Sequence, residues 1–294
     1  MTKRQLMILA ALTASSPAFA SERSNSTYPH GAENWATAAV PPPGTYLLDY
    51  ANFTTYDRLN GDDGQSLVPD FKVDAFANVM RVVHVTDRRI LGATYAVQAI
   101  VPVVDLSVRA GGGRSHVTGI GDIVVNPMVL SWKAGDVHIT AGIDIFLPTG
   151  GFKASRLANI GRNYVTFEPV LAVSYLPKSG FDLSAKIMYD LNTRNPDTKY
   201  LSGQELHVDF ALGKTFKNGL GVGAAGYVVH QTTDDSIRDA PALASGNRGR
   251  VFAIGPTVKY PVGKALLMAI WQHEVSASNR PQGDKFWLRL ITRL

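Results

Sequence analysis

Val137-His-Ile-Thr-Ala-Gly-Ile-Asp-Ile-Phe-Leu147 is the stretch that decides the fold, because apolar and polar residues alternate along it. Ile139 and Ile145 fall on one face, whereas His138 and Asp144 fall on the other. A period of two is the pattern of a β-strand, whose successive side chains point to opposite faces. The stretch is longer than an average strand of ~5 to 6 residues and close to the ~9 to 11 that a tilted strand needs to cross a bilayer. It therefore predicts a strand in a membrane.

Similar segments follow one another along nearly the whole chain. Helical periodicity is hard to find after residue 44, whereas alternation recurs. Most of the segments run for about 10 to 14 residues, again longer than strands of soluble proteins. Residues 44–294 are thus expected to form one all-β domain. Its twelve segments begin near Tyr46, Phe71, Leu91, Ile120, Val137, Tyr164, Phe181, Gln204, Leu220, Arg250, Ala265 and Lys285.

The connections between these segments alternate between long and short. This rhythm and an even strand count are typical of a transmembrane barrel, which has long external loops and short periplasmic turns. Hydrocarbon offers no hydrogen-bond partners, so a sheet survives there only when it closes and has no edge. We therefore predict a twelve-stranded antiparallel transmembrane β-barrel of the outer membrane. The long connections are 57–70, 105–118, 148–163, 193–203, 232–249 and 276–284; the short ones are 86–90, 133–136, 176–180, 217–219 and 261–264.

The composition of the 294-residue chain excludes several other classes of protein. Charged residues make up 18% of the chain, against about 25% in an average soluble protein. No stretch reaches the ~18 to 20 apolar residues of a spanning helix. The absence of cysteine excludes disulfides, thiol nucleophiles and lipid-modified cysteines. The net charge of +5 is mild and scattered, so we expect no nucleic-acid partner.

Residues 1–20 have the features of a secretory signal peptide. Lys3 and Arg4 precede a short apolar run, and Ala18-Phe-Ala20 has the small-x-small pattern of a signal-peptidase site. We expect cleavage after Ala20 and export from the bacterial cytoplasm to the outer membrane. Outer-membrane lipids and the barrel-assembly machinery are the partners expected there.

The polar faces of the segments carry charges of both signs, which suits a watery lumen. Ions in a dry core are costly, whereas ions in water can pair and stay hydrated. Apolar residues on the same faces suit a path for small hydrophobic molecules; plain packing of a constricted interior is the alternative. Twelve strands lie between the filled and the open barrels, so we expect a narrow, partly obstructed channel. The residues expected to line it are Lys72, Asp74, Phe76, Asp122, Asn126, His138, Asp144, Glu168, Lys186, Asp190, Glu205, His207, Asp209, Met268, Glu274, Trp287 and Arg289.

Residues 21–43 form a separate N-terminal segment that is too short for a domain. The part from Tyr28 to Pro43 is too aromatic and proline-rich for an ordinary tail. We expect it to enter the lumen from the periplasmic side as a plug, with Tyr28 and Trp35 as its aromatic residues. A disordered periplasmic tail is the alternative.

No catalytic, cofactor or metal site is predicted. Gly221-Val-Gly-Ala-Ala-Gly226 spells GxGxxG, but the next residues continue a strand instead of opening a helix. None of the seven histidines has the spacing of a metal motif, although a site could still assemble between strands. Asp144 and Glu168 could form an acid–base pair, but ion pairing in the lumen is the simpler interpretation.

Several short motifs of the chain together carry a family resemblance. With them the chain resembles the outer-membrane proteins related to the MetA-pathway phenol-degradation protein, over nearly the whole mature length. The resemblance implies a twelve-stranded channel or transporter for small hydrophobic or aromatic compounds. The motifs are Tyr28-Pro-His-Gly-Ala-Glu-Asn34, Pro41-Pro-Pro-Gly-Thr-Tyr46, Leu67-Val-Pro-Asp-Phe-Lys-Val-Asp74, Gly119-Ile-Gly-Asp122, Leu147-Pro-Thr-Gly150, Asn159-Ile-Gly-Arg-Asn163, Gly246-Asn-Arg-Gly-Arg250 and Arg280-Pro-Gln-Gly-Asp284.

Three functions are compatible with such a barrel. The first is passive uptake of a small hydrophobic or aromatic solute by a monomer, with release to the periplasm or sideways through the wall. The second is an outer-membrane enzyme of the lipid-hydrolase type, which would need serine, histidine and an orienting group on the lipid-facing wall. His230 and His273 are the only plausible bases for it. The third is a structural or adhesive barrel that acts through its loops.

Overall fold

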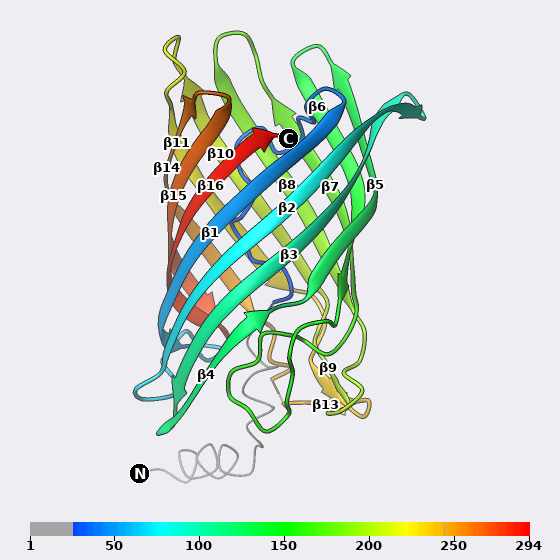
Figure 1. Ribbon diagram of the computed structural model, residues 1–294. Coiled ribbons are helices and arrows are strands. Elements are labelled where there is room, and N and C mark those ends of the chain that lie inside the picture. The colour runs from blue at the N-terminus through cyan, green and yellow to red at the C-terminus, as the bar shows by residue number, and fades with distance from the viewer. Residues whose placement is uncertain (1–25, 244) are drawn as a thin grey trace.

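The computed structural model describes residues 26–243 and 245–294, which form a closed β-barrel (Figure 1). The predicted signal peptide, residues 1–20, lies outside the described residues. No helix in the described part of the chain is long and apolar enough to cross a membrane. The wall consists of β1 (Gly44–Leu59), β2 (Lys72–Ile90), β3 (Ala93–Ala110), β4 (Gly113–Ile120), β5 (Ile123–Ala134), β6 (Val137–Leu147), β7 (Thr166–Tyr175), β8 (Phe181–Asn192), β10 (Glu205–Thr215), β11 (Gly221–Gln231), β14 (Arg250–Val262), β15 (Ala265–Ser278) and β16 (Pro281–Arg293).

The first and last strands pair with each other, which closes the sheet. β1 pairs antiparallel with β16 from Tyr46 opposite Arg293 to Leu59 opposite Pro281, and its other edge pairs with β2. β4 and β5 follow one another along the same edge of β3 and share one place in the wall. The barrel therefore has twelve strand positions. The predicted fold class and strand number are confirmed, and each predicted strand start lies within four residues of the observed one.

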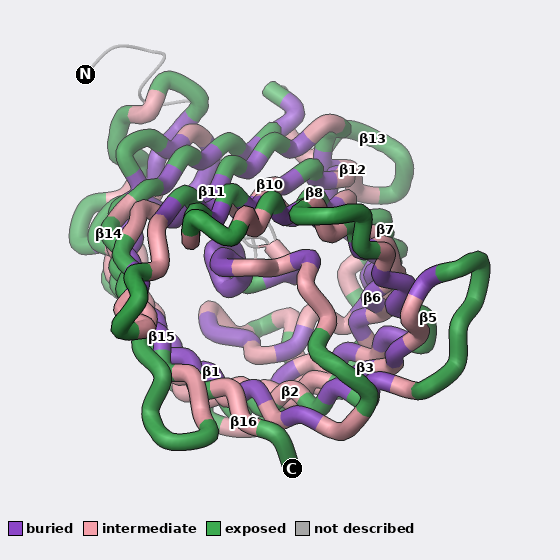
Figure 2. The backbone as a smooth tube through the Cα atoms, turned by 90° about the horizontal axis from the view of Figure 1, so that it is seen from above, coloured by how far each residue is buried: buried purple, intermediate pink, exposed green. Residues whose placement is uncertain are grey.

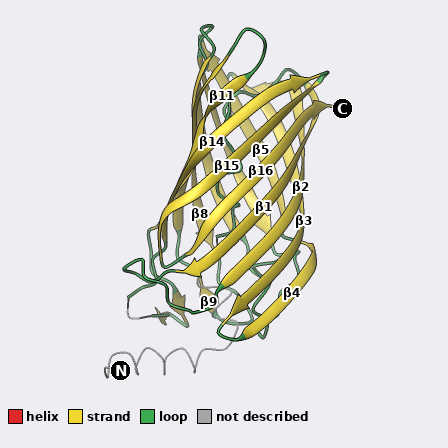
Figure 3. Ribbon diagram, turned by 90° about the vertical axis from the view of Figure 1, so that its left-hand side faces the viewer, coloured by secondary structure: helices red, strands yellow, loops and turns green. Residues whose placement is uncertain are grey.

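The two ends of the barrel differ in their connections. Both ends of the wall chain, at Gly44 and Arg293, lie at the short-turn end, where the C-terminus appears in Figure 1. The opposite, long-loop end carries the connection from β6 to β7 and a small sheet of β9 (Tyr200–Leu201), β12 (Ser236–Ile237) and β13 (Ala240–Pro241) (Figure 3).

Two of the predicted long loops are strand hairpins instead. Between β3 and β4 only Gly111 and Gly112 form the turn, with φ of 56° and 81°. Between β15 and β16 only Asn279 and Arg280 remain outside the strands, and Asn279 has a φ of 52°. The polar composition of these stretches suggested loops, but backbone hydrogen bonding continues equally well where a hairpin extends into water.

Exposure alternates along the wall strands, as the colours of Figure 2 show. On β8, Leu183, Ile187 and Leu191 are exposed on the outside, whereas Asp182 and Asp190 are buried on the inside. An apolar outer surface suits contact with lipid, and a polar inner surface suits a hydrated or filled lumen. The alternation that identifies the strands thus also separates the two environments.

Closure of the barrel can be tested with a disulfide, because the native chain contains no cysteine. Ala51 of β1 lies directly opposite Leu288 of β16, and cross-strand neighbours have Cα atoms ~4.5 to 5.5 Å apart, within disulfide range. We expect the variant with Ala51→Cys and Leu288→Cys to oxidise to a cross-linked form whose boiled sample still migrates faster than the reduced protein on a denaturing gel.

The matched control carries Ala51→Cys and Ala269→Cys. Ala269 of β15 pairs with the far side of Leu288, so it lies two strands from Ala51, about 10 Å away. This control is expected not to cross-link. Equal cross-linking of both variants, or none in either, would contradict the observed seam.

Candidate functional site

Residues 26–43, here called the luminal segment, run through the interior of the barrel (Figures 1 and 2). At the long-loop end, Arg162 donates a hydrogen bond of 2.6 Å to the Ser26 carbonyl oxygen. At the short-turn end, Arg293 donates one of 3.3 Å to the Pro43 carbonyl oxygen. The chain therefore crosses the whole lumen before β1 begins. The contacts of this segment with the wall define the site.

Asp209 of β10 holds the first turn of the luminal segment. Its buried carboxylate accepts hydrogen bonds of 2.9 Å from the Tyr28 hydroxyl, 2.9 Å from the Gly31 amide and 3.0 Å from the Glu33 amide. A buried carboxylate needs such donors to offset its lost hydration. Gly31 has a φ of +85°, and a Cβ there would lie 2.1 Å from the Gln272 Oε1. The positive φ therefore favours glycine at this turn.

Glu33 is the charged anchor of the luminal segment. Its carboxylate forms a short ion pair with Arg81 of β2 and lies 3.3 Å from the Arg289 guanidinium of β16. The Tyr50 hydroxyl donates a further hydrogen bond of 2.9 Å. Breaking such a buried pair by removing one partner costs ~3 to 5 kcal/mol, because the other charge remains buried. The segment and the β16–β1–β2 wall therefore hold each other in place.

Trp35 is the largest side chain that the luminal segment buries, at 2% exposure. Its indole nitrogen donates a hydrogen bond of 2.9 Å to the Thr257 hydroxyl oxygen. The Lys259 ammonium lies 4.0 Å from the ring centre, which gives a cation–π contact. A Cβ on Gly213 of β10 would lie 2.0 Å from the ring. The absence of a side chain at that wall position makes the space for the indole.

Backbone groups bind the remaining part of the luminal segment to the wall. The Ala36 amide donates to Asp182 at 2.9 Å, and the Ala38 amide donates to the Ser174 hydroxyl oxygen at 3.1 Å. The Ala38 carbonyl oxygen accepts a hydrogen bond of 2.8 Å from the Thr140 hydroxyl. The segment has no regular secondary structure, so these wall side chains satisfy backbone groups that would otherwise be buried without partners.

Most of the residues predicted to line the lumen lie on the inner face. Each of these inner-face residues is buried except His138, which is partly exposed near the short-turn end. They surround or directly contact the luminal segment, so the interior is much fuller than an open pore. They are Asn126, His138, Asp144, Glu168, Lys186, Asp190, Glu205, His207, Asp209, Met268, Glu274, Trp287 and Arg289.

Asp122 lies at the break between β4 and β5 and serves mainly to hold a loop. Its carboxylate accepts hydrogen bonds of 2.8 Å each from the amides of Gly150 and Arg162. Burial raises the pKa of Asp122 above its usual range, while these two amides oppose the rise. The residue borders the interior cavity, but it also fixes the long loop that covers that cavity.

The expected inward positions of Lys72, Asp74 and Phe76 are wrong. These side chains lie on the outer face of β2, where the ring centre of Phe76 lies 4.8 Å from that of the outward-facing Phe53, with the two rings tilted. The inner face of β2 carries small apolar residues and Arg81 instead. Lys72 and Asp74 lie at the long-loop end of the strand, where an outward charge meets water and not lipid. Polarity alone therefore assigned the faces of this strand incorrectly.

Several interior residues were not predicted from the sequence. Arg81 binds Glu33, Gln98 receives two hydrogen bonds from Arg81, and Lys259 covers Trp35. Arg81 lies among the apolar residues of β2. A single arginine within an apolar membrane strand is the signal by which it could have been recognised as an interior residue.

Inner charges are distributed unevenly around the lumen. Carboxylates concentrate on β6, β7, β8 and β10, with Glu168, Asp190 and Asp209 as examples, whereas arginines lie on β2 and β16. Lys186 lies among these carboxylates on the acidic side, 3.7 Å from Asp144. The luminal segment lies between the two sides. Its backbone amides face the acidic side, and Glu33 faces the arginines.

A cavity of about 200 Å³ remains between the luminal segment and the wall. Tyr28, Pro29 and Ala32 form its inner side, and a loop with Ile160 closes it toward the long-loop end. Most of the remaining lining is apolar, but six charged side chains also border the cavity: Glu33, Arg81, Asp122, Asp144, Arg162 and Lys186. The other lining residues are Thr27, Tyr50, Val79, Gln98, Ile100, Pro102, Val104, Gly121, Val124, Phe146 and Trp287.

The groups considered for catalysis are engaged elsewhere or stand apart. Asp144 accepts hydrogen bonds of 3.0 Å from Gln98 and 2.9 Å from Asn126, and Glu168 lies 3.3 Å from His207. His230 and His273 are exposed on the outer face, and His273 contacts Asp284 at 3.1 Å. Within residues 26–243 and 245–294, no serine hydroxyl forms a hydrogen bond to either imidazole.

Comparisons with known proteins agree with this architecture. The family model described as "Putative MetA-pathway of phenol degradation" matches residues 56–290, so the chain belongs to that family. The barrel is similar to the crystal structure of the COG4313 outer membrane channel from Pseudomonas putida F1, with a TM-score of 0.77 and 14% identity over 92% of this chain and 100% of that one. The shared fold is that of an outer-membrane barrel.

More distant similarities extend to other outer-membrane barrels. The NanC porin matches with a TM-score of 0.46 and 8% identity, over 84% of this chain and 99% of that one. The β-domain of the Bordetella autotransporter BrkA matches with a TM-score of 0.49 and 9% identity, over 85% and 99%. A search among curated protein sequences found no match.

The fit between Gly213 and Trp35 gives a test of how the luminal segment is seated. We expect Gly213→Val to displace the indole of Trp35. The free energy that holds the luminal segment in the barrel should fall by ~1 to 3 kcal/mol, as overpacking typically costs. Protease should then cleave within residues 28–43 faster than in the native protein, while the barrel keeps its heat-modifiable migration on gels.

Gly151→Val is the matched control, because a Cβ at Gly151 meets nothing within 4 Å. Its cleavage rate should equal that of the native protein. If Gly213→Val is cleaved no faster than this control, Trp35 does not hold the segment.

Proposed function

We propose that the chain is an outer-membrane channel for passive uptake of small hydrophobic or aromatic molecules. The observation that carries the proposal is the largely apolar cavity within an otherwise polar, ion-paired interior. Against the apolar part of this lining, a solute gains about 25 cal/mol for each Å² of apolar surface removed from water. Membership in a family described by phenol degradation points to the same class of solute.

The size of the cavity suits a molecule with one aromatic ring. A cavity of about 150 Å³ lined by apolar side chains is large enough to bind benzene, and this one measures about 200 Å³. Ile100, Val124 and Phe146 supply apolar contact, while Arg81 and Gln98 offer hydrogen bonds to a polar substituent. A phenol-like solute would use both kinds of group.

The proposal includes an orientation and a cellular location. In it, the long loops face the cell exterior, the short turns and both wall ends face the periplasm, and residues 1–20 are removed after Ala20 on export. One barrel encloses the whole path, so a monomer suffices. Nothing in the proposed path needs an energy source.

The luminal segment acts in this proposal as the constriction of the channel. Deletion of residues 28–40 should raise single-channel conductance in planar bilayers several-fold, because the segment fills the centre of the lumen. The barrel should still fold, since residues 44–294 make all the wall pairings. Unchanged conductance of the folded deletion variant would show that the segment does not limit flow.

The cavity itself can be tested by filling it. Ile100→Trp adds bulk to the inner wall, and we expect it to abolish complementation of a knockout strain grown on low concentrations of single-ring aromatic carbon sources. Ile187→Trp is the matched control, because Ile187 faces outward at 39% exposure. Growth should be compared over a panel of aromatic and terpenoid compounds. Equal growth of both variants on every compound that requires the protein would contradict the proposed path.

A further inference from the structure

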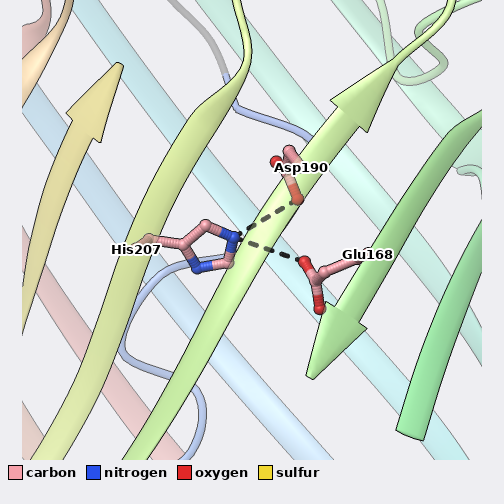
Figure 4. A group of neighbouring side chains, drawn as sticks. All are labelled: Glu168, Asp190 and His207. Atoms are coloured by element: carbon pink, nitrogen blue, oxygen red, sulfur yellow. Dashed lines mark hydrogen bonds and ion pairs between the residues drawn. The ribbon is translucent and has the colours of Figure 1, made fainter. Parts of the chain in front are cut away.

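Three metal-ligating side chains from neighbouring strands converge on the inner face of the barrel (Figure 4). Glu168 lies on β7, Asp190 on β8 and His207 on β10. Their exposed fractions are 0%, 1% and 0%. The His207 Nε2 lies 3.3 Å from the Glu168 Oε2 and 3.3 Å from the Asp190 Oδ1. The strand register, and not any sequence motif, brings the three together.

The spacing of these atoms is long for ion-paired hydrogen bonds. Such bonds between an imidazolium and a carboxylate usually measure ~2.7 to 2.9 Å. The observed 3.3 Å instead equals the distance between two ligand atoms of a tetrahedrally coordinated zinc ion. That distance is about 3.3 Å when each ligand atom lies ~2.0 to 2.1 Å from the zinc. One imidazole N–H also cannot point at both carboxylates at once, whereas one cation can contact all three ligands.

Glu168 supplies a further indication of a missing partner. Both of its carboxylate oxygens are buried, and within the described residues neither has a hydrogen-bond partner of ordinary length; the Oε2 contact is the 3.3 Å ion pair with the His207 Nε2. An unsatisfied buried carboxylate is costly, more so than a neutral polar group. The carboxylate points toward His207 (Figure 4), so a cation at the centre of the three groups would satisfy it.

The composition of the cluster also suits a cation. Two carboxylates face one imidazole, so with both carboxylates ionised one negative charge remains in excess even when His207 is protonated. The Lys186 ammonium on the same inner face lies 3.7 Å from Asp144, outside the cluster. A divalent cation would offset the charge that the local residues leave.

We propose that Glu168, Asp190 and His207 form a binding site for a divalent transition-metal ion of the zinc type. One imidazole and two carboxylates suit Zn²⁺ and related ions, whereas Ca²⁺ and Mg²⁺ prefer oxygen ligands alone. The ion would join β7, β8 and β10 across the inner wall.

The site adjoins the luminal segment. The ring of Tyr28 lies 4.8 Å from that of His207, and the ring of His30 lies 4.7 Å from it. These two rings cover the imidazole on the lumen side. A metal ion that fixes His207 would therefore also fix the surface on which the segment rests, and it would be loaded most readily during folding.

The test uses the full mature chain without an affinity tag, refolded into detergent with ZnCl₂ and then washed with a weak chelator. Metal analysis should find about one Zn²⁺ per folded chain, as a three-residue site predicts. We expect Glu168→Gln and His207→Gln to reduce the bound zinc at least about tenfold. A strong chelator should lower the thermal midpoint of the native protein but not that of Glu168→Gln.

His116→Gln is the matched control, because His116 also contacts a carboxylate, that of Asp105 at 2.9 Å, but on an exposed hairpin. It should bind as much zinc as the native protein. The heat-modifiable gel shift reports folding for every variant. A folded native protein that retains no zinc, or a folded Glu168→Gln variant that retains as much as the native one, would overturn the proposal.

Discussion

Closure of the sheet is the constraint on which the rest of the structure depends. A strand edge in hydrocarbon would leave backbone groups without partners, each at a cost of several kcal/mol. The pairing of β1 with β16 removes that edge and at the same time creates an interior. Twelve strands enclose a space too wide to be filled by wall side chains alone. The chain fills much of that space with residues 26–43.

Filling the interior with polypeptide requires partners for its backbone, and the wall supplies them. Asp209, Asp182 and Thr140 receive or donate the hydrogen bonds that a strand or helix would otherwise provide within the segment. The charged inner face is therefore more than a lining of a pore. Much of it is the binding surface for the protein's own N-terminal residues, and the cavity is the part that they leave empty.

The fold could be predicted from the sequence because its cause is local. On β6 and β8, alternation of branched apolar and polar residues specifies both the strand and its two faces. On β2 the same reasoning failed, since Ala75, Ala77 and Val79 face inward and Phe76 faces outward. These inward residues are small and apolar, and Val79 borders the cavity, so the inner face of this strand has the same apolar character as its lipid-facing surface. Polarity indicates a face only where the two environments differ in polarity.

The site depends on relations between distant residues, which the sequence does not display. Tyr28 and Trp35 could be recognised as unusual for a tail, but nothing near them identifies Asp209 or Gly213 as their counterparts. The reason for a glycine at position 213 becomes clear only when the Trp35 indole is seen to pack in the space that a side chain would fill. The convergence of Glu168, Asp190 and His207 likewise depends on the register of three strands.

The separation of acidic groups on β6 to β10 from arginines on β2 and β16 has a consequence for any molecule in the lumen. Opposed charges across a narrow, weakly polarisable interior produce a transverse electric field, directed across the barrel axis. A neutral molecule with a dipole would lower its energy by turning that dipole along the field. The interior would thus hold any polar molecule that enters it in one preferred orientation relative to the barrel axis.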